Sequence, residues 1–455
     1  ENDSRAILYV YSFISGADWA DEVARIDRMS KITKQDVVDW ANKYLGPESY
    51  AIIYKREGKD PDEQKIAAPK ITPIVTNRDS QSEFLSEIQT SQVQPIEPVF
   101  VDYKKDMSQF EAQPGIDVLY KKNETNDIFT LIYVFNTGTE NDPALNLAFN
   151  YLSYLGTDKM TAEEIASEMY DIACSFYMNA GANQSSIQIT GLSENMGKAM
   201  EIVEGLIAGA KPDEAILENL KGDMLKSRAD AKLNQSRCFG ALQRYLFYGG
   251  DFIRRTTLTD PALQALTSEQ LLAKIGGLMG KQHEVLYYGP QKEAEVKSAL
   301  AKHHKVAADL QPLEKKFSTL LPTDANKVVL AQYDAKQLYY LQFSNRGEKF
   351  DVAADPEITL YNEYFGGGMN TIVFQEMREA RGLAYTAWAT LATPSNANGD
   401  YSYYAFIATQ NDKMQKAVEA FDDIINNMPE SEKAFGIAKE ALVSRLRTER
   451  TVKDG

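Results

Sequence analysis

The chain has 455 residues, enough for about two to four domains of ordinary size, so a single small module is excluded. Hydrophobic residues make up 44% and charged residues 25% of the composition, which excludes a disordered, a collagen-like and a disulfide-stapled protein. The 65 acidic and 49 basic residues give a formal net charge of -16, which argues against nucleic acid or anionic lipid as a partner. The longest apolar runs are strand-sized, so we expect no membrane span.

Only three histidines and two cysteines are present, which limits the chemistry that the chain can carry alone. His283 lies in a strand-like run, and His303 and His304 adjoin in a polar helical segment, so no pair has the i, i+4 spacing of helical metal ligands. A self-contained zinc hydrolase or Ser-His-Asp enzyme is therefore not expected. A thiol enzyme that pairs Cys174 or Cys238 with His283 is a further alternative, but both cysteines lie in predicted helical segments, where buried inert thiols are common.

Residues 1–58 begin with a helical stretch, continue through a second helix that starts at Thr33, and end in a predicted strand at 50–58. Asp36 follows Thr33 by three residues, which predicts a variant of the capping box. Two helices and an edge strand are too little to bury a core alone. Residues 59–110 are rich in Pro, Gln, Glu, Asp and Ser and show little periodicity, which predicts a long linker.

Residues 111–310 have the pattern of a complete α/β domain, in which strands alternate with helices and the last strand contains His283. The predicted helices include Pro143 to Leu155, Ala162 to Ala173 and Asn195 to Ala208. After a polar bridge at 311–325, strands and helices begin again in residues 326–455.

Two internal sequence similarities, each called an echo here, indicate a repeated domain. Asp18 corresponds to Asp251 and Tyr54 to Tyr287, each pair 233 residues apart. A second echo, at an offset of 210, aligns the segment that begins at Tyr151 with the segment that begins at Tyr361. The repeat predicts the tail of one copy, one whole copy and the front of another, with chance similarity between amphipathic helices as the alternative.

The segment of highest interest, residues 366–385, reads GGGMNTIVFQEMREARGLAY. Its triple glycine lacks the residues of a nucleotide site and predicts a tight turn with a close helix approach. Four residues have the spacing of a buried helix face: Met369, Ile372, Val373 and Met377. Gly382 is the predicted helix stop, and Arg381 is predicted to be a surface charge.

Arg378 precedes Tyr385 by seven residues, so both side chains would point the same way if the helix ran on. The guanidinium suits a peptide carbonyl or a carboxylate, and the phenol hydroxyl suits a developing oxyanion. On spacing alone, a surface ion pair for Arg378 and a packed ring for Tyr385 are favoured.

This segment resembles the C-terminal-domain signature of the pitrilysin/insulinase family of zinc peptidases, in which two glycines, an apolar helix, Arg, Gly-Leu-Ala and Tyr recur in that order. The resemblance implies a processing-peptidase-like metallopeptidase fold of repeated α/β (α+β) domains, each with an antiparallel-rich mixed sheet and helices packed on one face. It further implies that 1–58 is the C-terminal tail of a second domain and 59–110 a linker. Residues 111–310 would be a complete, degenerate third domain, and 326–455 a fourth domain truncated at its C-terminal end.

In that family the zinc site belongs to the first domain, where an inverted His-x-x-Glu-His motif supplies two ligands and a water-activating glutamate. Aligned through Gly156-Thr157, the corresponding positions here are Leu147, Asn150 and Tyr151. Leucine cannot ligate, asparagine is a poor base and tyrosine is a rare zinc ligand. The resemblance therefore implies no metal site in this chain and a zinc ion bound outside it, in the full-length enzyme.

Arg378 and Tyr385 match the family's Arg and Tyr, which contact the bound peptide near the scissile carbonyl, so the resemblance implies catalytic and substrate-binding roles for both. We expect the non-metal C-terminal portion of a zinc-dependent metalloendopeptidase that encloses and cleaves peptides, inactive when alone. The expected partners are the peptide substrate and an N-terminal zinc-binding half, in the same polypeptide or in a separate subunit.

The alternative function is a catalytically inactive partner or scaffold subunit of such a peptidase. A His-x-x-Glu-His motif upstream of Glu1 would favour the one-polypeptide enzyme, whereas a nearby start codon would favour the subunit. For a bacterial source, the expected location is periplasmic or exported.

Overall fold

The computed structural model of the protein describes residues 2–55, 58, 82–92, 94–313 and 318–449. The chain divides into two compact units, Glu1–Gln92 and Val93–Gly455.

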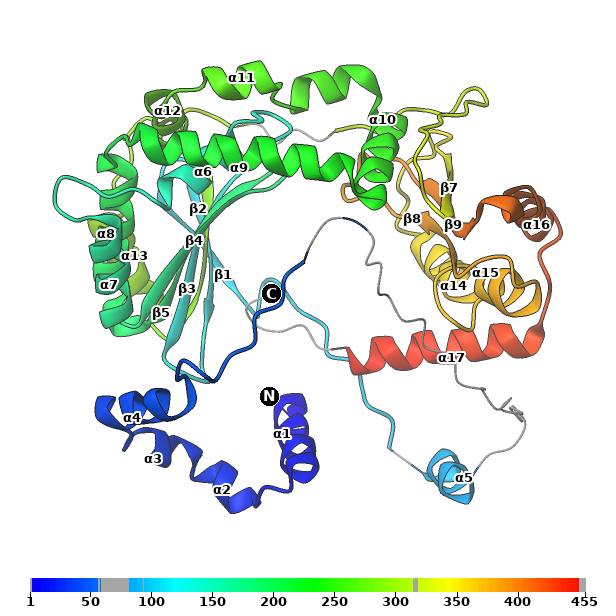
Figure 1. Ribbon diagram of the computed structural model, residues 1–455, viewed down its shortest axis with the longest axis horizontal. Coiled ribbons are helices and arrows are strands. Elements are labelled where there is room, and N and C mark those ends of the chain that lie inside the picture. The colour runs from blue at the N-terminus through cyan, green and yellow to red at the C-terminus, as the bar shows by residue number, and fades with distance from the viewer. Residues whose placement is uncertain (1, 56–57, 59–81, 93, 314–317, 450–455) are drawn as a thin grey trace. The chain divides into compact units, whose positions relative to one another are not determined.

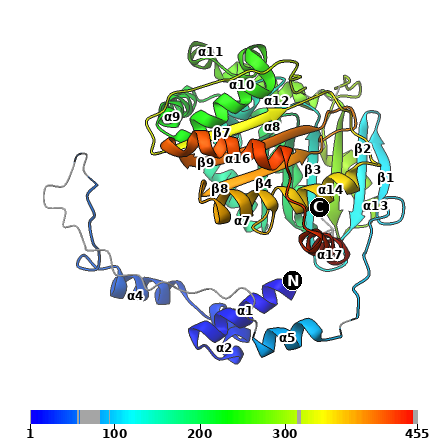
Figure 2. The same ribbon diagram turned by 90° about the vertical axis from the view of Figure 1, so that its right-hand side faces the viewer.

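The first unit contains helices and, among its described residues, no strand. The helices are α1 (Asn2–Ser15), α2 (Trp19–Val23), α3 (Arg25–Met29), α4 (Lys34–Tyr44) and α5 (Glu83–Thr90) (Figures 1 and 2). The predicted capping box is confirmed at the start of α4, where the Thr33 hydroxyl accepts from the Asp36 N–H at 3.2 Å and the Asp36 carboxylate accepts from the Thr33 N–H at 2.8 Å.

The strand predicted at 50–58 is absent from the described residues of that range, so this prediction was wrong. Its apolar side chains lie in solvent, with Ile53 92% exposed. A strand forms only beside another strand, and the described part of the first unit offers no partner. Residues 59–81 of the predicted linker lie outside the described residues, and its later part contains α5.

The second unit is built on a six-stranded sheet in the order β1-β2-β6-β3-β5-β4. Figure 1 labels β1 to β5 of this sheet. Its strands are β1 (Ser108–Gln113), β2 (Ile116–Lys122), β3 (Ile128–Phe135), β4 (Cys174–Ala180), β5 (Ser185–Leu192) and β6 (His283–Gly289). Neighbouring strands are antiparallel except β2 and β6, which are parallel. The predicted α/β fold class with an antiparallel-rich mixed sheet is confirmed.

Burial alternates along these strands, as expected for a sheet with one face on the core. On β3, Phe129, Leu131 and Tyr133 are at most 1% exposed, whereas Thr130 and Ile132 between them are half-buried. The helices that contact this sheet are α6 (Leu145–Leu152), α7 (Ala162–Asp171), α8 (Met196–Gly209) and α13 (Glu293–His303). The chain between α8 and β6 forms α9 (Glu214–Lys232), α10 (Gln235–Thr256), α11 (Asp260–Ala265) and α12 (Ser268–Met279).

A second sheet, in the order β7-β9-β8, follows in the same unit. Its strands are β7 (Gln337–Ser344), β8 (Thr386–Ala392) and β9 (Ser402–Gln410), and the helices of this part are α14 (Asp355–Phe365), α15 (Ile372–Phe374), α16 (Met414–Asn426) and α17 (Glu432–Thr448). Ala405 and Ile407 of β9 join Val373, Met377 and Phe421 in one buried cluster, so α15 and α16 share a core with the sheet.

Aromatic side chains of α10 pack against this second sheet. The Phe239 ring lies 5.8 Å from that of Phe406, and the Phe247 ring lies 4.7 Å from that of Phe343. α10 is kinked at Gly249, where φ is +81°, a conformation that glycine adopts readily. The second sheet is therefore joined to α10 by aromatic contacts as well as by the chain.

Two strands of the six-stranded sheet were not predicted from the sequence. β1 begins inside the predicted linker, and β4 begins at Cys174, which was expected at the end of a helix. The helix before it, α7, ends at Asp171, and Ala173 then takes a positive φ of 48° that turns the chain into β4. The prediction for Cys174 was therefore wrong, because the chain leaves the helix a few residues earlier than its apolar pattern suggests.

Candidate functional site

The segment predicted to carry chemistry forms α15 and then a π-helical turn over Gln375–Ala380, before the chain enters β8. Val373 and Met377 are fully buried and fix this turn in the core. Met369 is 71% exposed because the helix starts only after it, so its predicted burial was wrong. A π-helical turn widens a helix locally and is frequent at functional sites.

Arg378 and Tyr385 lie side by side, although no continuous helix connects them. Gly382 has a φ of +56°, and the chain reverses there, so Tyr385 returns toward the turn from the start of β8. The Arg378 guanidinium carbon lies 4.8 Å from the Tyr385 ring centroid and 5.0 Å from the Phe374 ring centroid, a cation–π arrangement. The helical path predicted between the two residues was wrong, but the structure brings their side chains together.

Both side chains of this pair reach solvent. Tyr385 is 71% exposed, and the Arg378 side chain is 38% exposed. The Arg378 Nε atom lies 3.7 Å from Glu379 Oε1, which is longer than a hydrogen bond. The pair therefore offers a fork of N–H donors and a phenol hydroxyl that a peptide carbonyl or a carboxylate is able to approach.

Arg381 is more than the surface charge predicted for it. Its Nη2 atom donates to Asp423 Oδ2 on α16 at 2.9 Å, and its Nε atom lies 3.5 Å from Glu376 Oε2. The hydrogen bond from Arg381, followed by one from Asn427, lowers the pKa of Asp423 below its ordinary value. The π-helical turn is thus tied to α16 by an arginine with two carboxylate neighbours.

The first residue of the triple glycine, Gly366, allows the backbone of β8 to approach closely. A Cβ on Gly366 would collide with the carbonyl oxygen of Ala389 on β8, whose N–H donates to the Gly366 carbonyl at 2.9 Å. A Cβ on Gly367 would meet nothing within 4 Å. The predicted close approach is confirmed at Gly366.

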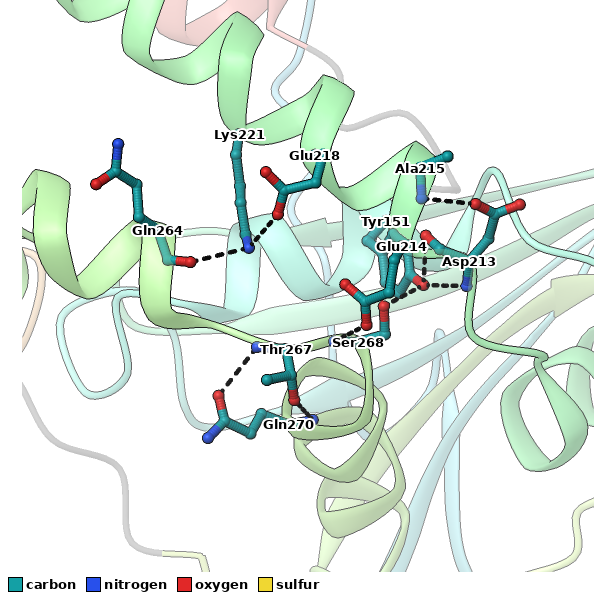
Figure 3. A network of polar contacts seen from close by, with 10 residues as sticks. All are labelled: Tyr151, Asp213, Glu214, Ala215, Glu218, Lys221, Gln264, Thr267, Ser268 and Gln270. Atoms are coloured by element: carbon teal, nitrogen blue, oxygen red, sulfur yellow. Dashed lines mark hydrogen bonds and ion pairs between the residues drawn. The ribbon is translucent and has the colours of Figure 1, made fainter.

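The three positions that stand where a zinc motif would lie do not fit a metal ion. Leu147 is a buried apolar side chain, and Asn150 is exposed. The Tyr151 hydroxyl is fully buried and donates to the Ser268 hydroxyl at 2.8 Å, and it accepts from the Asp213 N–H at 2.7 Å (Figure 3). Tyr151 therefore joins α6 to the starts of α9 and α12 as a structural residue.

A buried lysine belongs to the same region. The Lys221 ammonium donates to Glu218 Oε1 at 2.7 Å and to the Gln264 carbonyl at 3.1 Å, which joins α9 to α11 (Figure 3). In the part of the chain that the structure describes, no group of three or more His, Cys, Asp and Glu side chains is placed to hold a metal ion.

Two of the three histidines meet in the core, which spacing along the chain did not predict. His283 Nε2 lies 2.9 Å from His304 Nε2, and His304 Nδ1 lies 2.5 Å from Glu204 Oε1. The Tyr133 hydroxyl donates to the same carboxylate oxygen at 3.0 Å. Burial lowers the pKa of His283 to about 4, so its ring is neutral at pH 7. Only the pairing of distant elements reveals this cluster, since the residues come from four separate elements.

The thiol-enzyme alternative finds no support in these contacts. His283 faces His304 and the Lys281 carbonyl, and neither cysteine is its partner. Cys174 is buried, which raises the pKa of its thiol. The Cys238 thiol lies on α10, as predicted, and faces backbone carbonyl groups.

A hollow of about 420 Å³ lies between the kink of α10 and the β8–β9 connection, lined by Tyr248, Ser318, Pro394, Asp400 and Tyr404 among others. Neither Arg378 nor Tyr385 lines it. Among the described residues, no helix has the length and apolar composition that crossing a membrane requires.

Residues 282–442 match the protein family described as the peptidase M16 inactive domain. The similarity to this family is thus shown for that part of the chain. The matched residues include the whole of 366–385, so the predicted resemblance to the C-terminal portion of a zinc-peptidase family is confirmed there. The match runs across the boundary predicted between 310 and 326, and the domain limits themselves stay predictions.

The chain is also similar to other known proteins. The chain is 22% identical over 266 residues to an uncharacterized zinc protease of Streptomyces coelicolor, across 54% of this chain and 56% of that protein. Its fold resembles the peptidase M16 inactive domain from Pseudomonas fluorescens, with a TM-score of 0.58 and 17% identity over 76% of this chain and 85% of that one. It also resembles the periplasmic protease PqqL from Escherichia coli, with a TM-score of 0.60 and 12% identity over 93% of this chain and 45% of that one. The chain thus spans about half the length of two of these proteins.

Proposed function

We propose that this chain is the substrate-holding, non-metal portion of a zinc-dependent endopeptidase. The observation that carries the proposal is the pair of Arg378 and Tyr385, which presents N–H and O–H donors together at the surface. The name of the Streptomyces relative, a zinc protease, supports the activity class. The zinc ion and the water that it activates would belong to an N-terminal half, either in the same polypeptide or in a separate subunit.

In this account the chain does no metal chemistry. Arg378 binds a carbonyl or carboxylate of an extended peptide through its planar fork of donors. The Tyr385 hydroxyl lies beside it and donates to the oxygen on which negative charge develops during attack by water. An oxyanion donor of this kind is worth about 100- to 1000-fold in turnover when it is well placed.

The experiment is reconstitution with an N-terminal half that carries a His-x-x-Glu-His motif. The predicted result is cleavage of unfolded peptides that a zinc chelator abolishes, with no cleavage by either part alone. A complex that forms but cleaves none of a broad peptide library would favour a scaffold subunit and contradict the proposal.

A further inference from the structure

The chain between Arg378 and Tyr385 is held at several points by side chains from other elements. On its later side, the Thr409 hydroxyl donates to the Leu383 carbonyl at 2.5 Å, and Lys413 Nζ donates to the Gly382 carbonyl at 3.2 Å. Both anchors come from the end of β9 and the turn that follows it. They fix the strand end that carries Tyr385.

The earlier side, which carries Arg378, is tied to a different element. Arg381 lies three residues after Arg378 and four before Tyr385, and its guanidinium joins Glu376 of the π-helical turn to Asp423 of α16. The second oxygen of Asp423 accepts from the Asn427 amide at 3.1 Å, so this carboxylate is held from two sides. Arg378 has no such partner on α16 among the described residues.

We propose that Arg381 is a positioning residue, which through Asp423 holds the π-helical turn against α16 and so sets the distance between the Arg378 guanidinium and the Tyr385 ring. The inference rests on the proposed function, because it concerns how the same pair is held for a peptide. A planar guanidinium with two carboxylates fixes direction as well as distance, which a lysine ammonium does not. Small displacements of a catalytic group reduce turnover strongly, and a shift of 1 Å costs on the order of 100-fold.

The test uses the reconstituted enzyme and a fluorogenic peptide. Asp423→Asn and Arg381→Gln are compared with Glu363→Gln, which weakens a matched arginine–carboxylate pair between Arg445 of α17 and Glu363 of α14, 2.8 Å long. We expect each of the first two variants to lower kcat at least about fivefold with little change in KM. Arg381→Lys keeps the charge and restores part of kcat. Glu363→Gln leaves kcat unchanged, and the melting temperatures of all four variants agree within a few degrees.

The second arm is a double-mutant cycle with Tyr385→Phe. If Arg381 acts through the pair, Asp423→Asn lowers kcat much less in the Tyr385→Phe background than in the parent enzyme. Equal effects in both backgrounds, or an unchanged kcat in Asp423→Asn, would overturn the positioning role. If Tyr385→Phe is itself fully active, the proposed function of the pair fails instead, so the two failures are distinguishable.

Discussion

The Arg378 guanidinium carbon lies 4.8 Å from the centroid of the Tyr385 ring, across a reversal of the chain at Gly382. The centroid of the Phe374 ring lies 5.0 Å from the same carbon, so the cation contacts two aromatic rings. A side chain held in this way loses little further freedom when a peptide binds.

Arg378→Lys tests whether the planar set of guanidinium N–H donors, and not the positive charge alone, binds the peptide. Lysine keeps the positive charge but loses the planar, bidentate donor set and the stacking area. In the reconstituted enzyme we expect KM for a peptide to rise about tenfold or more, with a smaller change in kcat. Arg445→Lys, on the far helix α17, serves as the matched control and leaves both constants unchanged. An Arg378→Lys enzyme with the parent KM would contradict the proposed role of the guanidinium donors in peptide binding.

Gly366→Ala tests the close approach between α14 and β8. The new methyl group would collide with the Ala389 carbonyl oxygen, which is backbone and cannot rotate away. We expect a loss of about 1–3 kcal/mol in the free energy of unfolding, the usual cost of overpacking. Gly367→Ala, which adds its methyl group to open space, should change stability by less than about 0.5 kcal/mol. Urea unfolding of this chain measures both, and equal stability of the two variants would refute the contact.

Tyr151→Phe tests whether the degenerate zinc position has become structural. The substitution leaves the buried Ser268 hydroxyl and the Asp213 N–H without their partner. Ser268 is fully buried, and a buried hydroxyl left without its partner costs about 1–3 kcal/mol. Tyr154→Phe is the control, since Tyr154 is 52% exposed. Equal unfolding midpoints for the two variants would show that Tyr151 does not hold α6 to α9 and α12.

The elements predicted correctly are those with local signals. Thr33 and Asp36, which form the capping box, lie only three residues apart in the sequence, so the start of α4 could be predicted. Residues 128–135 could be predicted as a strand because their apolar and β-branched side chains are consecutive in the sequence. The family resemblance also rested on one continuous segment, 366–385, whose residue order is specific.

The features missed from sequence depend on distant partners. A strand at 50–58 was predicted from its apolar residues, but none of the described residues pairs with it. The cluster of His283 and His304 forms only when β6 and the end of α13 reach the same core. Arg381 was predicted as a surface charge because its partner Asp423 lies 42 residues away. Pairing and packing decide these cases, and neither leaves a short-range pattern.

Stability should fall in mild acid through His283. Its pKa is lowered by burial from 6.5 to about 4 in the folded chain, so between these values the unfolded chain binds a proton that the folded chain does not. The His283 ring faces His304, with Glu204 beyond it, and the rings of Tyr133 and Phe135. Tyr133 stays uncharged because burial raises the pKa of its hydroxyl above the ordinary value. We expect a loss of about 3 kcal/mol between pH 6.5 and pH 4 from this group.

The measurement for this acid effect is urea unfolding at several pH values for the parent chain and for His283→Gln. Carboxylates titrate in both proteins, so the difference between their slopes isolates His283. The variant should lose less stability than the parent between pH 6.5 and pH 4. Parallel slopes would contradict the assignment.

The most direct test of the account is the turnover number of the reconstituted enzyme with Tyr385→Phe. Removal of one hydroxyl that donates to a developing oxyanion should lower kcat about 100-fold while KM changes little. Tyr170→Phe, a control at a tyrosine of α7 that is 82% exposed, should keep the parent kcat. A Tyr385→Phe enzyme with the parent kcat would contradict the proposal that this chain supplies a catalytic donor.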